Sequence, residues 1–275
     1  MSDVSYINKP NRLLRVYALL FLLVLYLPIL SIPVFSFNDS IYVRFPLEGF
    51  TTQWFVQLWE RDSLWGALQH SLQVAIACAI ISTTFGVLAA RAIANTMLPG
   101  QSAIVAFIML PLVIPGIIFG VALLVLLSRI GITLSLYTVT LGHLIVCLPF
   151  AVATLLPRFE GFDRSMEEAS VDLGENSWWT FWRVTLPIVA PGIVASLLLT
   201  FTISFDEFIM AFFLSGQDAT LPMYIWSQLR FPREFPAVLA LSTIILLVSF
   251  ALVFSALWIG KLGLQKDDAA SRLGV

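Results

Sequence analysis

Six long apolar runs constrain this chain more than any other feature of its sequence. They cover residues 13–35, 66–90, 102–127, 134–156, 188–214 and 237–260. Each run reaches the ~20 residues that an α-helix needs to cross the hydrocarbon core of a bilayer. Charged residues make up only 12% of the 275 residues, whereas soluble domains carry about 25%. We therefore predict an all-α membrane protein with six transmembrane helices.

The basic residues indicate how these helices cross the membrane. With the N-terminus inside the cell, ten of the 15 basic residues fall on the inner side. Because inner segments of membrane proteins are enriched in Lys and Arg, both termini are predicted to lie in the cytoplasm. The inner set is Lys9, Arg12, Arg15, Arg91, Arg158, Arg164, Arg183, Lys261, Lys266 and Arg272, and the outer set is Arg44, Arg61, Arg129, Arg230 and Arg233.

The runs and this orientation divide the chain into four predicted parts. Residues 1–12 form a cytoplasmic tail, 13–60 the first transmembrane helix with a periplasmic loop, 61–260 the main transmembrane domain, and 261–275 a second cytoplasmic tail. Basic residues precede the first run, as they do in a signal peptide. However, the run is longer than a typical signal core, so an uncleaved span is predicted.

Composition and the placement of reactive residues argue against several functions. The net charge of −2 offers no basic field for nucleic acid. Cys78 and Cys147 lie in apolar runs, where small packing residues are expected rather than a disulfide. His143 stands alone in the fourth run and is expected to pack and hydrogen-bond, not to bind a metal. We predict no catalytic, metal or cofactor site in this chain, and a membrane enzyme lacks support.

Prolines are expected to interrupt two of the runs. Pro111 and Pro115 lie in the third run and Pro149 lies in the fourth. A proline inside a helix removes one backbone hydrogen bond and clashes with the preceding turn, so kinks or breaks are predicted at these positions.

A charged segment, residues 160–187, separates the fourth and fifth runs on the predicted cytoplasmic side. Ser165 and Glu168 fit a capping box, in which each side chain bonds the backbone N–H of the other residue. A short helix is predicted from there to Leu173. Gly174 suits the position after that helix, because glycine adopts the left-handed conformation without strain.

A second short helix is predicted in the same segment. Asn176 or Ser177 can cap its start, and it would extend to about Thr185. Pro187 then marks the return of the chain into the membrane as the fifth span. An alternative is an amphipathic surface loop without a partner, in which Glu168 serves only as a cap.

The segment resembles the EAA motif found in the permease subunits of ABC importers. That motif reads Glu-Ala-Ala, three residues, Gly, nine residues and Ile-x-Leu-Pro. The matching residues are Glu168, Ala169, Gly174, Leu186 and Pro187. Ser170 stands in place of the second alanine and Val184 in place of isoleucine, and both changes are small. The resemblance extends over roughly residues 60–260 and implies a type I importer fold.

The resemblance also implies partners and roles. In such permeases the motif forms a coupling helix that docks on a separate ATPase, so Glu168 would contact the ATPase and Gly174 would make the turn. The implied partners are an ABC ATPase dimer that binds ATP and Mg, and a periplasmic solute-binding protein. The implied location is the inner (plasma) membrane of a bacterium. The chain has no GxxxxGK[ST] loop, so it is not predicted to hydrolyse ATP itself.

Three further stretches look like the second permease of spermidine/putrescine systems. They begin at Ser36, Ser204 and Thr220 and read SFNDS, SFDEF and TLPMY. This likeness implies a polyamine substrate and a heterodimer with a second, related permease. Another small organic solute and a homodimer remain alternatives. One departure is His70, which stands where such permeases usually have asparagine.

The fifth run carries acids beside a polar stripe. Ser196, Thr200, Ser204 and Glu207 fall on one helix face at spacings of four, four and three, and Asp206 points to the side. A charge at mid-bilayer costs about 2.5–3.5 kcal/mol on insertion scales, so such acids usually face a cavity or a partner. We predict that the stripe lines the translocation path. In this prediction Glu207 meets a cationic solute and Asp206 pairs across the subunit interface. Packing or gating by hydrogen bonds is the alternative.

A second functional class uses the same acids. An ion-gradient-driven transporter or a channel would work through Asp206 and Glu207. Such a protein needs no cytoplasmic docking segment. The spacing of Glu168, Gly174 and Pro187 therefore favours the ABC importer.

Overall fold

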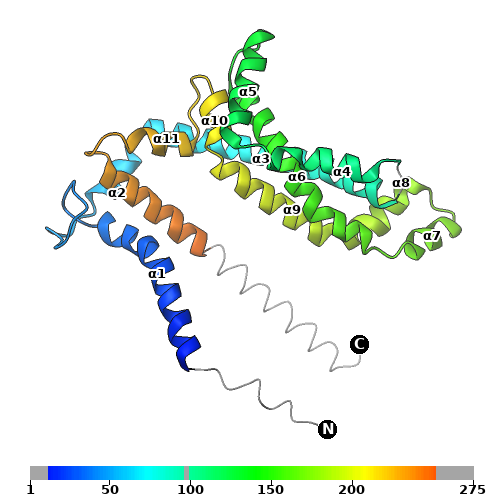
Figure 1. Cartoon of the computed structure of the whole chain (residues 1–275), viewed down its shortest axis with the longest axis horizontal. Coiled ribbons are helices and arrows are strands. Elements are labelled where there is room, and N and C mark those ends of the chain that lie inside the picture. The colour runs from blue at the N-terminus through cyan, green and yellow to red at the C-terminus, as the bar shows by residue number, and fades with distance from the viewer. Residues whose placement is uncertain (1–11, 96–98, 252–275) are drawn as a thin grey trace. The chain divides into compact units, whose positions relative to one another are not determined.

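The computed structural model describes residues 12–95 and 99–251 (Figure 1). These residues form helices and no β-strand, which confirms the all-α prediction. The two predicted tails, apart from Arg12, lie outside the described residues, as do residues 252–260 of the sixth run. The chain divides into two compact units, residues 62–226 and residues 1–61 with 227–275.

Four helices of the described chain are long and apolar enough to cross a membrane. They are α1 (Arg12–Ser36), α3 (Asp62–Asn95), α6 (Leu136–Glu160) and a continuous helix, Ser177–Asp206, that ends as α9 (Leu186–Asp206). A bent helix pair raises this number to five if it counts as one span. The helix of the sixth run, Phe235–Ala251, is shorter within the described residues.

The bent pair occupies the third apolar run. It consists of α4 (Gln101–Met109), the 3-10 turn η2 (Leu110–Leu112) and α5 (Gly116–Arg129), with an angle of 95° between the two arms. Pro115 precedes α5 with an extended backbone, ψ 127°, so the break predicted near Pro111 and Pro115 is confirmed. By contrast, α6 continues through Pro149 without a break.

The fifth run is not the single helix that we predicted. Helix α9 ends at Asp206, Glu207 is extended with ψ 112°, and the short helix α10 (Ile209–Leu214) follows. The carboxylate of Glu207 accepts the backbone N–H groups of Ile209 at 2.9 Å and Met210 at 3.2 Å. Glu207 thus caps α10, and because these donors would otherwise lack partners at a helix start, the cap stabilises the break.

In the unit of residues 62–226, α3, α6 and α9 pack against one another along their lengths. Two apolar clusters form the core of this unit. One contains Val74, Leu123, Val139, Met210 and Leu214, and the other contains Val87, Ala90, Leu155, Phe159 and Val189. Gly86 of α3 lies so close to α6 that an added Cβ would be 2.8 Å from the Cβ of Ala151. The helices therefore meet almost backbone to backbone at this point.

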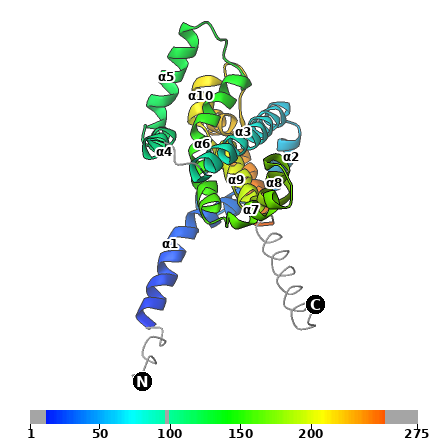
Figure 2. The ribbon, with the colours of Figure 1, turned by 90° about the vertical axis from the view of Figure 1, so that its right-hand side faces the viewer.

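Figure 1 shows that the two ends of this bundle carry different elements. Helices α7 (Ser165–Asp172) and α8 (Ser177–Thr180) lie at one end, and α10 and α11 (Leu221–Gln228) lie at the other. At the latter end His70 Nδ1 donates to the Ala219 carbonyl at 3.0 Å. The Ser71 hydroxyl accepts the backbone N–H of Leu221 at 2.8 Å. The unexpected histidine thus helps to attach the loop before α11 to α3. Figure 2 shows α4 and α5 diverging from the bundle in the turned view.

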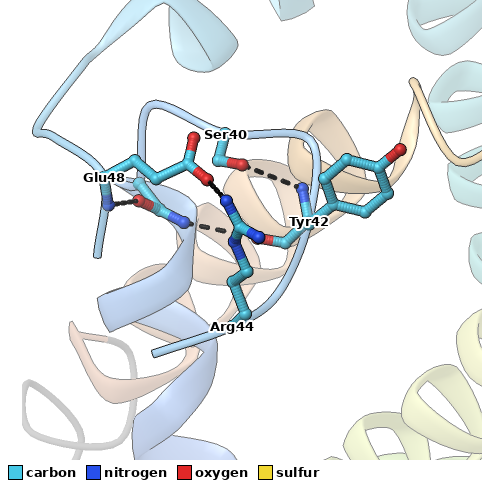
Figure 3. A network of polar contacts seen from close by, with 5 residues as sticks. Ser40, Tyr42, Arg44 and Glu48 are labelled. Carbon is cyan, nitrogen blue, oxygen red and sulfur yellow. Dashed lines mark hydrogen bonds and ion pairs between the residues drawn. The ribbon is translucent and has the colours of Figure 1, made fainter. Parts of the chain in front are cut away.

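The other unit contains α1, α2 (Gln53–Trp59), the loop between them and helix Phe235–Ala251. The apolar side chains of α1 are exposed along most of its length, as suits a helix whose solvent is lipid. The loop is ordered around Asn38, which is buried. Its amide accepts the N–H of Glu48 and donates to the carbonyl of Tyr42. In the same loop Arg44 forms an ion pair with Glu48 (Figure 3).

The contact at Gly86 generates a stability prediction. The substitution Gly86→Leu should lower the melting temperature of the purified protein, because α3 and α6 must separate to admit the side chain. Overpacking of this kind costs about 1–3 kcal/mol. Gly66→Leu is the matched control on α3, since an added Cβ there meets no atom within 4 Å. Equal melting temperatures for both variants would contradict the close approach.

Candidate functional site

Helix α7 carries the first half of the predicted coupling segment, but its start differs from the prediction. Ser165 is the first residue of the helix and not its cap, so the predicted capping box of Ser165 with Glu168 is wrong. The Asp163 carboxylate instead accepts the backbone N–H of Ser165 at 3.0 Å. Hydrogen bonds from the side chain and backbone of Ser165 lower the pKa of Asp163. An ionised carboxylate is a strong acceptor at the positive end of a helix, which explains why it takes the capping position.

The turn at Gly174 forms as predicted. Gly174 has φ +92°, and its N–H bonds the Val171 carbonyl at 2.9 Å. The N–H of Glu175 bonds the Ser170 carbonyl at 3.2 Å. These two bonds make a Schellman motif, in which the residue after the helix is left-handed. Only glycine adopts this conformation without a penalty, so the identity of residue 174 determines where α7 ends.

The second half of the segment is capped as predicted but does not form a separate helix. The Asn176 side chain accepts the N–H of Trp179 at 3.0 Å and starts α8. A π-helical turn, η3 (Phe181–Thr185), then passes directly into α9. Pro187 lies in the first turn of α9, after η3 has continued into that helix without a break. The predicted second helix and the fifth span are therefore one continuous helix, Ser177–Asp206.

The predicted docking residues differ in exposure. Glu168 and Ala169 are exposed, and no hydrogen bond or ion pair joins the Glu168 carboxylate to any residue that the structure describes. Leu173 is 88% exposed beside them. Ser170 instead faces inward, with its hydroxyl 3.0 Å from that of Thr180. Leu186 is half-buried and Pro187 is exposed at the start of α9.

Sequence reasoning missed Glu167, the neighbour of the motif glutamate. Its carboxylate accepts a hydrogen bond from the hydroxyl of Thr185, which is buried. It also lies 3.6 Å from the guanidinium of Arg91 on α3. Successive residues of a helix point about 100° apart, so two adjacent acids face different surroundings. This rotation of about 100° between neighbours is the signal from which different roles for Glu167 and Glu168 could have been predicted.

The hydroxyls of the predicted stripe are buried inside the bundle. Ser196 and Thr200 are 0% exposed and Ser204 is 3% exposed. The Ser196 hydroxyl lies 3.0 Å from that of Thr83 on α3. The Ser204 hydroxyl lies 2.8 Å from Nδ1 of His143 on α6, which confirms the expected hydrogen bond of that histidine. We call these cross-helix contacts the polar seam.

The two acids after the seam have different surroundings. Asp206 is exposed at the end of α9, and its carboxylate has no hydrogen-bond partner among the described residues. Glu207 is half-buried and caps α10 through its two backbone contacts. The two adjacent carboxylates therefore differ: that of Glu207 is used to cap α10, whereas that of Asp206 is available to a ligand or a partner.

The chain is similar in sequence to permeases of two transport systems. The chain is 35% identical to the spermidine/putrescine transport system permease protein PotC of Escherichia coli (strain K12) over 240 residues. The match covers 86% of this chain and 89% of the relative. It is 32% identical to the putrescine transport system permease protein PotI of the same strain, covering 90% and 89%.

The fold is also similar to one that has been solved. A chain of a bacterial ABC transporter involved in the import of the acidic polysaccharide alginate superposes with a TM-score of 0.71. That superposition covers 90% of this chain and 98% of the other, at 16% identity.

A family model confirms the resemblance that the EAA motif suggests. The model matches residues 82–262, which include α7, the polar seam and both acids. Permease subunits of this kind are membrane components without catalytic activity of their own. The chain belongs to the family of binding-protein-dependent transport system inner membrane components, and it is a permease subunit of an ABC importer.

Proposed function

We propose that this permease imports a polyamine, such as spermidine or putrescine, across the inner membrane of a bacterium. The observation that carries the proposal is the similarity to two polyamine permeases over at least 86% of the chain. A second, related permease would complete the path, and a periplasmic solute-binding protein would deliver the solute. An ABC ATPase dimer would bind ATP and Mg, and this chain would bind no cofactor.

The exposed face of α7 is the proposed docking surface for the ATPase. Glu168 and Ala169 present this face, and Gly174 ends it with a turn that only glycine forms without strain. Because the Glu168 carboxylate has no hydrogen bond or ion pair with a described residue, its charge is available to a partner. Ser170, Leu186 and Pro187 would hold the segment in shape behind this surface.

The proposed topology follows from the docking surface. An ATPase on α7 would place that end of the bundle in the cytoplasm. With the bent pair α4–α5 counted as one span and the sixth apolar run as another, the chain would cross six times. Both termini would then be cytoplasmic, which agrees with the distribution of basic residues.

The contacts around the break after α9 support a refined proposal for the substrate path. Asp206 would face the path and meet an ammonium group of the solute, since its carboxylate is exposed. Glu207 would hold α10 in place, and Ser196, Thr200 and Ser204 would fix α9 against its neighbours along the path. This assignment gives Asp206 the solute contact that the sequence alone suggested for Glu207, and it gives Glu207 a structural role at the start of α10.

The energy source separates this proposal from a gradient-driven carrier. In proteoliposomes containing the complete complex, spermidine uptake should require Mg-ATP on the ATPase side and should persist with a protonophore. The reason is that the proposed drive is closure of the ATPase, not an ion gradient. Uptake that continues without ATP and stops with the protonophore would show the alternative class to be correct.

Docking on α7 can be tested by reversing one charge. Glu168→Lys should weaken copurification of the ATPase at least about tenfold, since loss of a hot-spot residue costs an interface about 2 kcal/mol or more. The fold should be unaffected, because the Glu168 carboxylate makes no hydrogen bond or ion pair with a described residue. Glu160→Lys, which reverses an exposed charge on α6 outside α7, is the matched control. Normal ATPase recovery with Glu168→Lys would exclude the proposed surface.

The role of Asp206 can be tested with an isosteric change. Asp206→Asn should raise the KM for spermidine roughly tenfold, because hydrogen bonds to charged groups contribute about 1.5–3 kcal/mol. Asp218→Asn removes the same charge from a loop at the same end of the bundle and should leave KM unchanged. If both variants transport spermidine as the unmodified protein does, Asp206 does not contact the solute.

A further inference from the structure

We infer that Glu167 is a positioning residue that transmits movement of α7 to α3 and to the start of α9. The inference rests on the proposed docking of an ATPase on the opposite face of α7. It assigns the two adjacent glutamates to different tasks: Glu168 to the partner and Glu167 to the permease interior.

The contacts of Glu167 join three elements at one carboxylate. Its Oε1 accepts the hydroxyl proton of Thr185, the last residue before α9. The same oxygen lies 3.6 Å from the guanidinium of Arg91 near the end of α3. That guanidinium stacks 4.4 Å above the ring of Phe181 in η3. A displacement of Glu167 therefore acts on α3 and on the entry to α9 together.

A second contact keeps α7 aligned with α3. The Arg164 guanidinium, just before α7, donates to the backbone carbonyl of Ala94 at the end of α3. Two arginine contacts thus attach α7 to the same end of one long helix. Because α3 packs along α6 and α9 for most of its length, a push on α7 is carried into the bundle rather than absorbed by a loose loop.

The burial of these groups distinguishes them from a surface ion pair. The Glu167 and Arg91 side chains are 20% and 29% exposed, and Thr185 is 1% exposed. Partly buried charges are screened less than exposed ones, so the interaction energy of the pair changes more strongly when the two groups move. By comparison, the ion pair of Glu175 with Arg183 lies within the segment itself, with Arg183 60% exposed. It connects no part of α3.

The experiment measures spermidine transported per ATP hydrolysed by the complete complex in proteoliposomes. Glu167→Gln keeps an acceptor for Thr185 but removes the charge that faces Arg91. The ratio should fall about three- to tenfold, within the range of coupling changes seen for residues that link two sites. ATPase copurification and the melting temperature should stay unchanged. A purely structural role would lower the melting temperature and leave the ratio constant, and that result would overturn the inference.

A matched control variant and a double-mutant cycle make the test more specific. Glu175→Gln neutralises a glutamate of the same segment that pairs with an arginine, and it should leave the ratio unchanged. Arg91→Gln should lower the ratio as Glu167→Gln does. The double variant should lower it no further, because residues in contact give non-additive effects. Additive losses, or an equal loss with Glu175→Gln, would refute a specific role for Glu167.

Two further readouts separate this inference from the function on which it rests. If Glu167→Gln prevents ATPase copurification, Glu167 belongs to the docking surface and the inference is wrong while the docking proposal stands. Hydrogen exchange over residues 209–228, with and without vanadate-trapped nucleotide, follows transmission without any solute. A nucleotide response that is equal in Glu167→Gln and in the unmodified complex would overturn the inference even if spermidine is not the solute.

Discussion

The close packing of α3, α6 and α9 is the interaction on which the rest of this structure depends. In lipid the helices gain little by hiding apolar surface from one another, so association relies on close contact and on polar groups. Gly86 lets α3 approach α6, and the polar seam joins Thr83 to Ser196 and His143 to Ser204. Each hydroxyl in the seam finds a partner within the bundle, which avoids the cost of leaving it unpaired in hydrocarbon. Nε2 of His143, by contrast, is buried without a hydrogen-bond partner among the described residues.

This bundle places chemically different ends at a fixed distance from each other. One end holds α7, with Glu168 outside and Glu167 against Arg91 and Thr185. The other end holds the break between α9 and α10, where Glu207 makes a cap and Asp206 remains exposed. A rigid connection between the ends is what an importer needs if an ATPase acts at one of them and a solute passes near the other.

Local chemistry explains which sequence predictions succeeded. The turn at Gly174 and the cap at Asn176 involve residues within five positions of each other, so the local sequence determines them. The prediction of a cap at Ser165 was wrong because the carboxylate of Asp163, two residues earlier, is a stronger hydrogen-bond acceptor than a serine hydroxyl. The break after Asp206 was missed because apolar residues resume directly at Phe208, while the cap that stabilises the break depends on the side-chain conformation of Glu207.

The sequence by itself determined that the chain is helical, belongs in lipid, and carries a charged segment with a turn at Gly174. These properties follow from composition, run length and backbone preference. Only the tertiary structure decided that the stripe on α9 is buried and that Glu167 faces the bundle. The contact of Ser196 with Thr83 joins residues 113 positions apart, and the contact of Glu167 with Arg91 joins two different helices. Such contacts arise from helix packing, which periodicity within one segment does not specify.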